Sequence, residues 1–168
     1  MFSRLILKTA SFVAPKTDRT VRAARKMTQT STNHVARTRV MVADDNQAIR
    51  DLVVQILEAE FDVVGVASNG DEAVELAKRF LPEIGVLDIT MPGKTGIEAA
   101  EELLSNGSKI QIVFLTVHED PEFVRRALEI GASGYIAKRK MAKELTLAIK
   151  KISLGQNFIS PCCSPAEY

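Results

Sequence analysis

The chain has 168 residues, of which 46% are hydrophobic, which suits one globular domain with a tail and excludes a second full domain. Its longest apolar runs, such as the one at 112–117, are far shorter than the ~18 residues of a membrane helix, so we expect no transmembrane span. The net charge is only +1, but residues 1–39 carry nine Lys and Arg residues against one acid, while the rest of the chain is acidic.

The first 37 residues form a basic extension that is rich in Arg, Ser and Thr and poor in acid. This composition favours a disordered N-terminal extension, and Met27 is a possible alternative start of the chain. An organellar targeting peptide has the same composition and remains open. Contact with nucleic acid or anionic lipid is a weaker alternative, because the segment lacks interleaved aromatic residues and a binding motif.

From Arg39 onward, the spacing of hydrophobic residues alternates between the strand and helix periods. Segment 39–43 predicts a buried strand, and apolar residues at helical spacing over 49–57 predict the helix that follows. Segment 62–68 predicts a second strand, and a second helix opens near 68–73.

The second half of the chain repeats this alternation three times. Asp120 before Pro121 resembles an N-cap followed by proline at the first helical position, which fixes the start of one of the helices. The strands are predicted at 84–88, 110–116 and 133–138, and the helices at 96–104, 121–130 and 143–154.

Five strand-helix repeats of about 23 residues predict an α/β fold, in which helices cover both faces of a five-stranded parallel sheet. One common sheet of this doubly wound, flavodoxin-like type has the strand order 2-1-3-4-5, and it binds ligands outside the carboxyl ends of its strands. We therefore expect this order and a site at this edge.

Polar side chains follow four of the predicted strands at their carboxyl ends. Asp44 and Asp45 follow the first strand, Asp88 the third, Thr116 the fourth and Lys138 the fifth. Each one alone is more often a turn, a helix cap, a packing residue or a solvated charge. Their occurrence at matching ends of adjacent strands instead predicts one functional site.

Carboxylates held close together repel each other, so the ionised cluster needs a cation. Mg²⁺ binds one or two carboxylates and fills its other positions with water or phosphate oxygens. A carboxylate can also act as a nucleophile that forms an acyl phosphate, and an ammonium group and a hydroxyl can contact the phosphoryl oxygens. The pattern therefore predicts Mg²⁺-dependent phosphoryl transfer.

Four motifs in this order, VADDN, VLDITMPGKTG, FLTVHED and GYIAK, resemble the receiver domain of two-component response regulators. The resemblance covers residues 38–158 and leaves 159–168 as a short C-terminal tail. The amino-acid sequence near the end of the domain is most similar to that of receivers in LuxR and NarL type regulators. No helix-turn-helix domain follows in this chain, so a stand-alone receiver, a truncated protein and a fragment all remain open.

The resemblance implies a role for each residue at this edge. Asp88 would accept the phosphoryl group, Asp45 would bind Mg²⁺ directly and Asp44 would act largely through water. The backbone carbonyl of Thr90 would be another metal ligand. Thr116 and Lys138 would hold the phosphoryl group.

Three further positions bear on switching. Tyr135 would be the aromatic residue that rotates inward when Thr116 moves. Val117 is larger than the residue often found at its position in the family, which predicts narrowed access to the phosphoryl group. His118 and Thr90 occupy positions that tune the lifetime of the acyl phosphate, although an exposed loop histidine without a catalytic role is the more common case.

The resemblance implies a cytoplasmic phosphorelay protein that takes its phosphoryl group from a histidine kinase or a phosphotransfer protein. It would not be a turnover enzyme, because it catalyses only its own phosphorylation and dephosphorylation. We expect residues 121–154 to form the switching surface for a partner or a homodimer, or for transcriptional regulation. Cys162 and Cys163 are expected to be free thiols, because a bridge between neighbours would be strained.

Two alternatives stay open. One is a receiver-like scaffold that no longer takes phosphate. The other is a Mg²⁺-dependent phosphatase of the haloacid dehalogenase kind, which is disfavoured because Thr90 stands where that family has its second acid.

Overall fold

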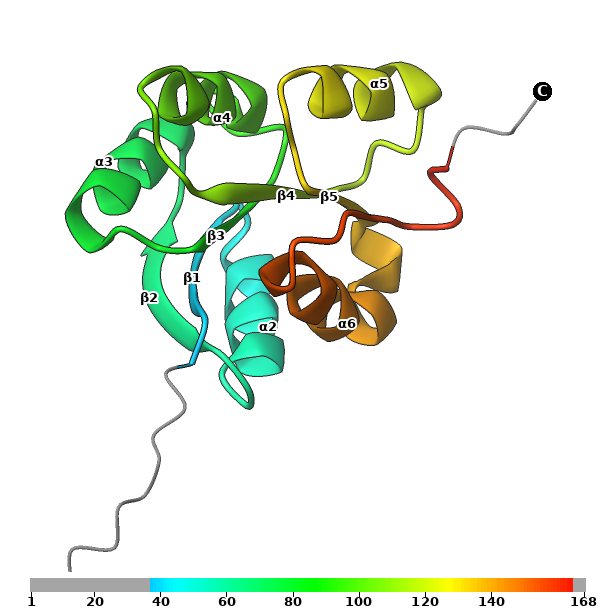
Figure 1. The fold of residues 1–168 in the computed structure, drawn as a ribbon, viewed down its shortest axis with the longest axis horizontal. Helices are drawn as coiled ribbons and strands as arrows, with labels where there is room; N and C mark the ends of the chain where they lie inside the picture. The colour runs from blue at the N-terminus through cyan, green and yellow to red at the C-terminus, as the bar shows by residue number, and fades with distance from the viewer. Residues whose placement is uncertain (1–36, 165–168) are drawn as a thin grey trace, which may run out of the picture. The chain divides into compact units, whose positions relative to one another are not determined.

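A computed structural model describes residues 37–164 of the chain (Figure 1). The elements are β1 (Arg39–Ala43), α2 (Gln47–Leu57), β2 (Asp62–Ala67), α3 (Gly70–Phe80), β3 (Ile84–Leu87), α4 (Gly96–Ser105), β4 (Gln111–Thr116), α5 (Pro121–Glu129), β5 (Gly134–Ala137), a short 3₁₀ helix (Lys138–Lys140), α6 (Met141–Ser153) and β6 (Phe158–Ile159). The basic extension that was predicted to be disordered lies outside the described residues.

The sheet is parallel throughout and has the order β2-β1-β3-β4-β5-β6. The first five strands confirm the predicted order 2-1-3-4-5, and the two-residue β6 adds an unpredicted sixth strand at the β5 edge. The strands predicted at 62–68, 84–88 and 133–138 each end one residue early, so Asp88 and Lys138 lie just beyond β3 and β5. Both residues therefore lie at the carboxyl edge of the sheet, outside the regular alternation of strand side chains.

Helices α3, α4 and α5 cover one face of the sheet, and α2 and α6 cover the other (Figure 1). Side chains of β4 alternate between the two cores, because successive residues of a strand point to opposite faces. Ile112 and Phe114 join the first core, whereas Val113 and Leu115 join the second. This burial on both faces explains why the central strands are continuously apolar.

Polar residues fix the start of the helices that follow the site loops. The side chain of Asn46 accepts hydrogen bonds from two backbone N–H groups of α2, and Thr95 forms a capping box with Glu98 at the start of α4. Asp120 caps α5 with Pro121 behind it, as predicted from the sequence. The loops between strand ends and helices therefore have defined end points.

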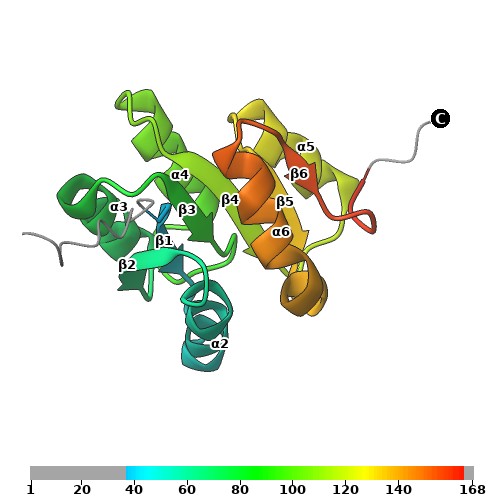
Figure 2. The same ribbon diagram turned by 60° about the horizontal axis from the view of Figure 1, so that its bottom comes forward.

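The chain after α6 returns to the sheet (Figure 2). The predicted domain boundary after residue 158 falls inside β6, and the packing continues to Ser160 and Cys163, which are both buried. Among the helices of residues 37–164, none is long and apolar enough to cross a membrane.

Candidate functional site

Two buried aspartates stand side by side at the carboxyl edge of the sheet. Asp44 follows β1 and Asp88 follows the adjacent β3, and the backbone N–H of Asp88 donates to the carbonyl of Ala43 at 2.8 Å. Asp88 is only 4% exposed and Asp44 only 2%. The register of two neighbouring strands thus brings together carboxylates that lie 44 positions apart in the chain.

A glycine lets α4 start directly beneath Asp88. The N–H of Gly96 donates to the carbonyl of Ile89 at 3.0 Å. A Cβ atom on Gly96 would lie 1.9 Å from the carbonyl oxygen of Asp88, a distance that no side chain can tolerate. This close approach holds the loop after β3 and keeps Asp88 at the edge of the sheet.

Lys138, the first residue after β5, bridges the two aspartates. Its Nζ donates a hydrogen bond to Oδ2 of Asp88 at 2.8 Å and forms an ion pair with Oδ2 of Asp44 at 2.7 Å. Removal of a charge from water is costly, and the partly buried ammonium of Lys138 offsets part of this cost for the two buried carboxylates. The predicted meeting of these three residues is present in the structure.

Burial and pairing shift the proton affinities of this cluster. Burial raises the pKa of Asp88, and the hydrogen bond from Lys138 offsets only part of that rise. For Lys138, burial lowers the pKa, but the hydrogen bonds to Asp44 and Asp88 outweigh it and the net shift is upward. Asp88 is therefore a carboxylate whose charge is incompletely compensated by the protein.

The cluster has the composition of a site for a hard divalent cation. Asp44, Asp45 and Asp88 each offer a carboxylate oxygen, and these oxygens lie within 4.8 Å of one another. Asp45 is exposed, so one side of the cluster faces solvent. Within residues 37–164, Oδ1 of Asp88 is buried and accepts no hydrogen bond. An unpaired buried oxygen beside two further carboxylates fits Mg²⁺, which prefers oxygen ligands.

Thr116 at the end of β4 and Tyr135 of β5 both contact the loop after β4. Both are fully buried. Oγ1 of Thr116 accepts from the backbone N–H of His118 at 3.2 Å, and the Tyr135 hydroxyl donates to the carbonyl of His118 at 2.8 Å. The aromatic residue that was predicted to rotate inward is therefore inside the protein, and it is fixed by the loop after β4.

Sequence reasoning missed the contacts that His118 makes. Its Nε2 lies 2.8 Å from Oγ1 of Thr90, and its ring stacks on Phe123 of α5 at a centroid distance of 4.4 Å. These contacts join the loop after β3 to α5. The family resemblance singled out Thr90 and His118 as neighbouring influences on the acyl phosphate, but it did not predict these contacts, which depend on how the two loops pack against each other. Val117 points away into solvent, with 68% of its surface exposed.

Arg50 is a second residue that the sequence did not reveal. Its Nη1 donates to the carbonyl oxygens of Asp44 and Asp45 at 2.7 and 2.9 Å. The guanidinium thus holds the backbone of the acid pair from the first turns of α2. An arginine one turn into an amphipathic helix is ordinarily a solvated charge, so its position alone predicts nothing.

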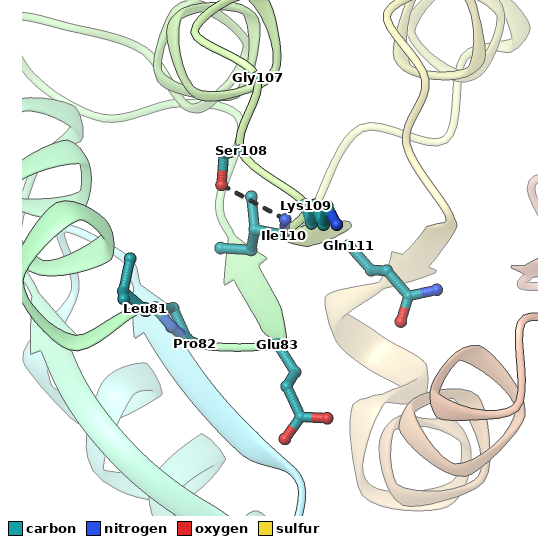
Figure 3. A pocket seen from close by; sticks show the side chains of 8 residues that line it. All are labelled: Leu81, Pro82, Glu83, Gly107, Ser108, Lys109, Ile110 and Gln111. Carbon is teal, nitrogen blue, oxygen red and sulfur yellow. Dashed lines mark hydrogen bonds between the residues drawn. The ribbon is translucent and has the colours of Figure 1, made fainter.

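A pocket at the opposite, amino edge of β3 and β4 contains none of these residues. It is lined by the loops that lead into the two strands, with Leu81 and Glu83 on one side and Ser108 and Gln111 on the other (Figure 3). Glu83 is the only acid that lines it, and Lys109 is the only base. The pocket therefore lacks the clustered carboxylates of the carboxyl edge.

Comparison with known proteins agrees with this geometry. The family described as response regulator receiver domain matches residues 40–150, and the chain belongs to it. The transcriptional regulatory protein DesR of Bacillus subtilis is 37% identical over 124 residues, which are 73% of this chain and 61% of DesR. The chain spans only about half to three fifths of the curated relatives that it matches.

Solved receiver structures share the fold. The signal receiver domain of the putative response regulator NarL from Mycobacterium tuberculosis is 33% identical, with a TM-score of 0.69 over 71% of this chain and 98% of that one. A LuxR family two-component response regulator from Aurantimonas sp. SI85-9A1 is 34% identical, with a TM-score of 0.70 over 73% of this chain and 89% of that one. The predicted resemblance to receivers of LuxR and NarL type regulators is confirmed.

Proposed function

We propose that this receiver domain is phosphorylated on Asp88 as part of a phosphorelay. A carboxylate oxygen of Asp88 attacks phosphorus, a new P–O bond forms, and the bond to the donor breaks so that the donor leaves with the electron pair. The observation that carries the proposal is the buried Asp88, with one oxygen held by Lys138 and the other unpartnered within the described residues.

The surrounding side chains would stabilise the transferred group. Lys138 already lies 2.8 Å from Asp88 and supplies positive charge, and Thr116 supplies a hydroxyl from the adjacent strand. Asp44, Asp45, Asp88 and the carbonyl of Thr90 would hold Mg²⁺, which supplies positive charge to the phosphoryl oxygens when bound.

The loop of His118 would transmit the change to α5. A phosphoryl group adds about −1.5 to −2 charge, which would draw Lys138 and the Thr116 hydroxyl toward it. Movement of Thr116 would disturb His118, whose backbone it contacts and whose ring stacks on Phe123. The surface of α5, β5 and α6 within residues 121–154 would then change its affinity for a partner or a second copy.

The partner would be a histidine kinase or a phosphotransfer protein, in a cytoplasmic setting. On this proposal the domain is a switch and not a turnover enzyme, because the phosphoryl group stays on its own residue until it is hydrolysed. DesR is named a transcriptional regulatory protein. A role in transcription is proposed for this chain by that similarity alone.

Intact mass after incubation with acetyl phosphate and Mg²⁺ tests the proposal. The wild type should gain one phosphoryl group only when Mg²⁺ is present, and Asp88→Asn should gain none. Asp51→Asn, which changes an exposed aspartate on α2, is the matched control and should behave as the wild type does. Phosphorylation of Asp88→Asn, or no adduct on the wild type with Mg²⁺ bound, would contradict the proposal.

A further inference from the structure

A second cluster of metal-binding side chains lies beside β5, and it is separate from the acidic site. Glu119 in the loop after β4 and the adjacent Cys162 and Cys163 each offer a ligand atom, and these atoms lie within 4.8 Å of one another. The two cysteines are free thiols. One carboxylate and two sulfurs form a softer ligand set than the carboxylates of Asp44, Asp45 and Asp88.

The backbone holds the two thiols in place. Ser160 donates its N–H to the carbonyl of Tyr135 at 2.8 Å, directly after β6 pairs with β5. The N–H of Cys163 then donates to the carbonyl of Ser160 at 2.8 Å and closes a turn. Cys163 is only 2% exposed and packs in the same core as Tyr135, while Cys162 is partly exposed. The site is thus anchored on one side and open on the other.

The spacing of the sulfurs suits a shared metal better than a disulfide. Their Sγ atoms lie 3.8 Å apart. Two Zn–S bonds of about 2.3 Å at a tetrahedral angle place two sulfurs about 3.8 Å apart, so the thiols already have the spacing of a zinc site. A disulfide would instead bring the sulfurs to about 2.05 Å, and neighbouring Cα atoms at about 3.8 Å are closer than bridged cysteines normally are.

Glu119 can contribute without leaving its present partner. Arg139 contacts both of its carboxylate oxygens, with Nη2 at 2.6 Å from Oε2. Each carboxylate oxygen has two acceptor positions, so the group can accept from Arg139 and bind a metal together. Burial raises the pKa of the Cys163 thiol to about 12, so a bound metal ion must displace the thiol proton.

We propose that Cys162, Cys163 and Glu119 bind one soft divalent metal ion of the Zn²⁺ and Cd²⁺ class. Two metal–sulfur bonds form, and the two thiol protons pass to the buffer. A fourth position remains for water or another donor. Because Glu119 lies next to His118 in the loop after β4, bound metal would tie that loop to the C-terminal segment. The site does not depend on phosphorylation of Asp88.

Titration of the reduced, chelator-treated chain with Cd²⁺ tests this site, with saturating Mg²⁺ to occupy the acidic cluster. The wild type should bind one Cd²⁺ per chain and develop a sulfur-to-cadmium charge-transfer band. Cys162→Ser and Glu119→Gln should each weaken binding by about tenfold or more. Glu122→Gln, an exposed acid on α5, is the matched control and should keep the wild-type affinity.

Two readouts on the wild type keep the test independent of whether the variants fold. Bound Zn²⁺ should protect Cys162 from alkylation, measured by intact mass, and should slow hydrogen exchange in residues 117–120. The absence of a charge-transfer band, unchanged binding by Cys162→Ser, or half an equivalent of metal with dimer formation would each overturn the proposal.

Discussion

Charged side chains are exposed and paired at the amino edge of the sheet, whereas at the carboxyl edge they are buried and incompletely paired. At the amino edge, Arg39 donates to the carbonyl of Leu81, and its backbone N–H donates to Glu83, both near solvent. At the carboxyl edge, Asp44 and Asp88 are buried around Lys138, and an oxygen of Asp88 has no partner among the described residues. The charged groups at the amino edge are thus paired, whereas the negative charge of the two aspartates at the carboxyl edge is only partly compensated.

This difference indicates that the carboxyl edge, which carries the candidate site, is less stable than full pairing of its charges would make it. Buried charges stabilise a protein only when they are fully paired, and a carboxylate that must receive another group cannot be fully paired. Matched substitutions at the two edges test this reading. Chemical denaturation in Mg²⁺-free buffer at neutral pH supplies the free energy of unfolding for each variant.

The largest effect is expected from Lys138→Met. Loss of the ammonium leaves Asp44 and Asp88 buried together without their cation, which should lower the free energy of unfolding by about 4 kcal/mol. Mg²⁺ should restore part of the loss. Lys109→Met, an exposed lysine at the amino edge, should change stability by less than about 0.5 kcal/mol. Equal effects of the two substitutions would show that the buried ion pairs carry no special weight.

Gly96→Ala should lower stability by about 3 kcal/mol, because its Cβ would meet the carbonyl oxygen of Asp88. Gly107→Ala, near the amino edge, is the control: its φ is +76° but no atom lies within 4 Å of the added Cβ. Backbone strain alone should cost about 1 kcal/mol there. A smaller loss for Gly96→Ala than for Gly107→Ala would mean that the loop under Asp88 moves easily.

Asp88→Asn should raise the free energy of unfolding at neutral pH, because burial raises the pKa of this carboxyl above its ordinary value of 3.8 in the folded state. Such a group stabilises the fold only while it is protonated, and this contribution is lost as the pH rises through the folded-state pKa. The gain from asparagine should therefore shrink as the pH falls toward 4.

Glu83→Gln is the matched change at the amino edge, where the side chain accepts from the N–H of Arg39 and an amide oxygen can do the same. It should alter stability by less than about 0.5 kcal/mol. A gain from Asp88→Asn that does not vary with pH would exclude titration of this carboxyl as its cause.

Tyr135→Phe should have the smallest effect at the carboxyl edge, a loss of about 0.5 to 1 kcal/mol for the hydrogen bond to the carbonyl of His118. Thr90→Val, which removes the exposed contact to the His118 ring, is the comparison and should cost less. A larger loss for Thr90→Val would show that the exposed contact between Thr90 and His118 stabilises this loop more than the buried hydrogen bond of Tyr135 does.

Much of the site could be predicted because it depends on strand ends. Asp44, Asp88, Thr116 and Lys138 each follow or end a strand whose apolar run is plain in the sequence, and parallel strands align their carboxyl ends. The short β6 could not be predicted, because a two-residue strand has no measurable period. The contacts of Arg50 and His118 depend on side-chain directions across loops.

The sequence by itself determined the alternation of elements, the edge of the sheet that carries the carboxylates and the family to which the chain belongs. Only the tertiary structure decided how those charges pair, with Lys138 between Asp44 and Asp88, and that Cys162 and Cys163 lie beside Glu119. Local hydrophobic periods are set by neighbours along the chain. Pairing between residues tens of positions apart is instead set by strand register and loop packing.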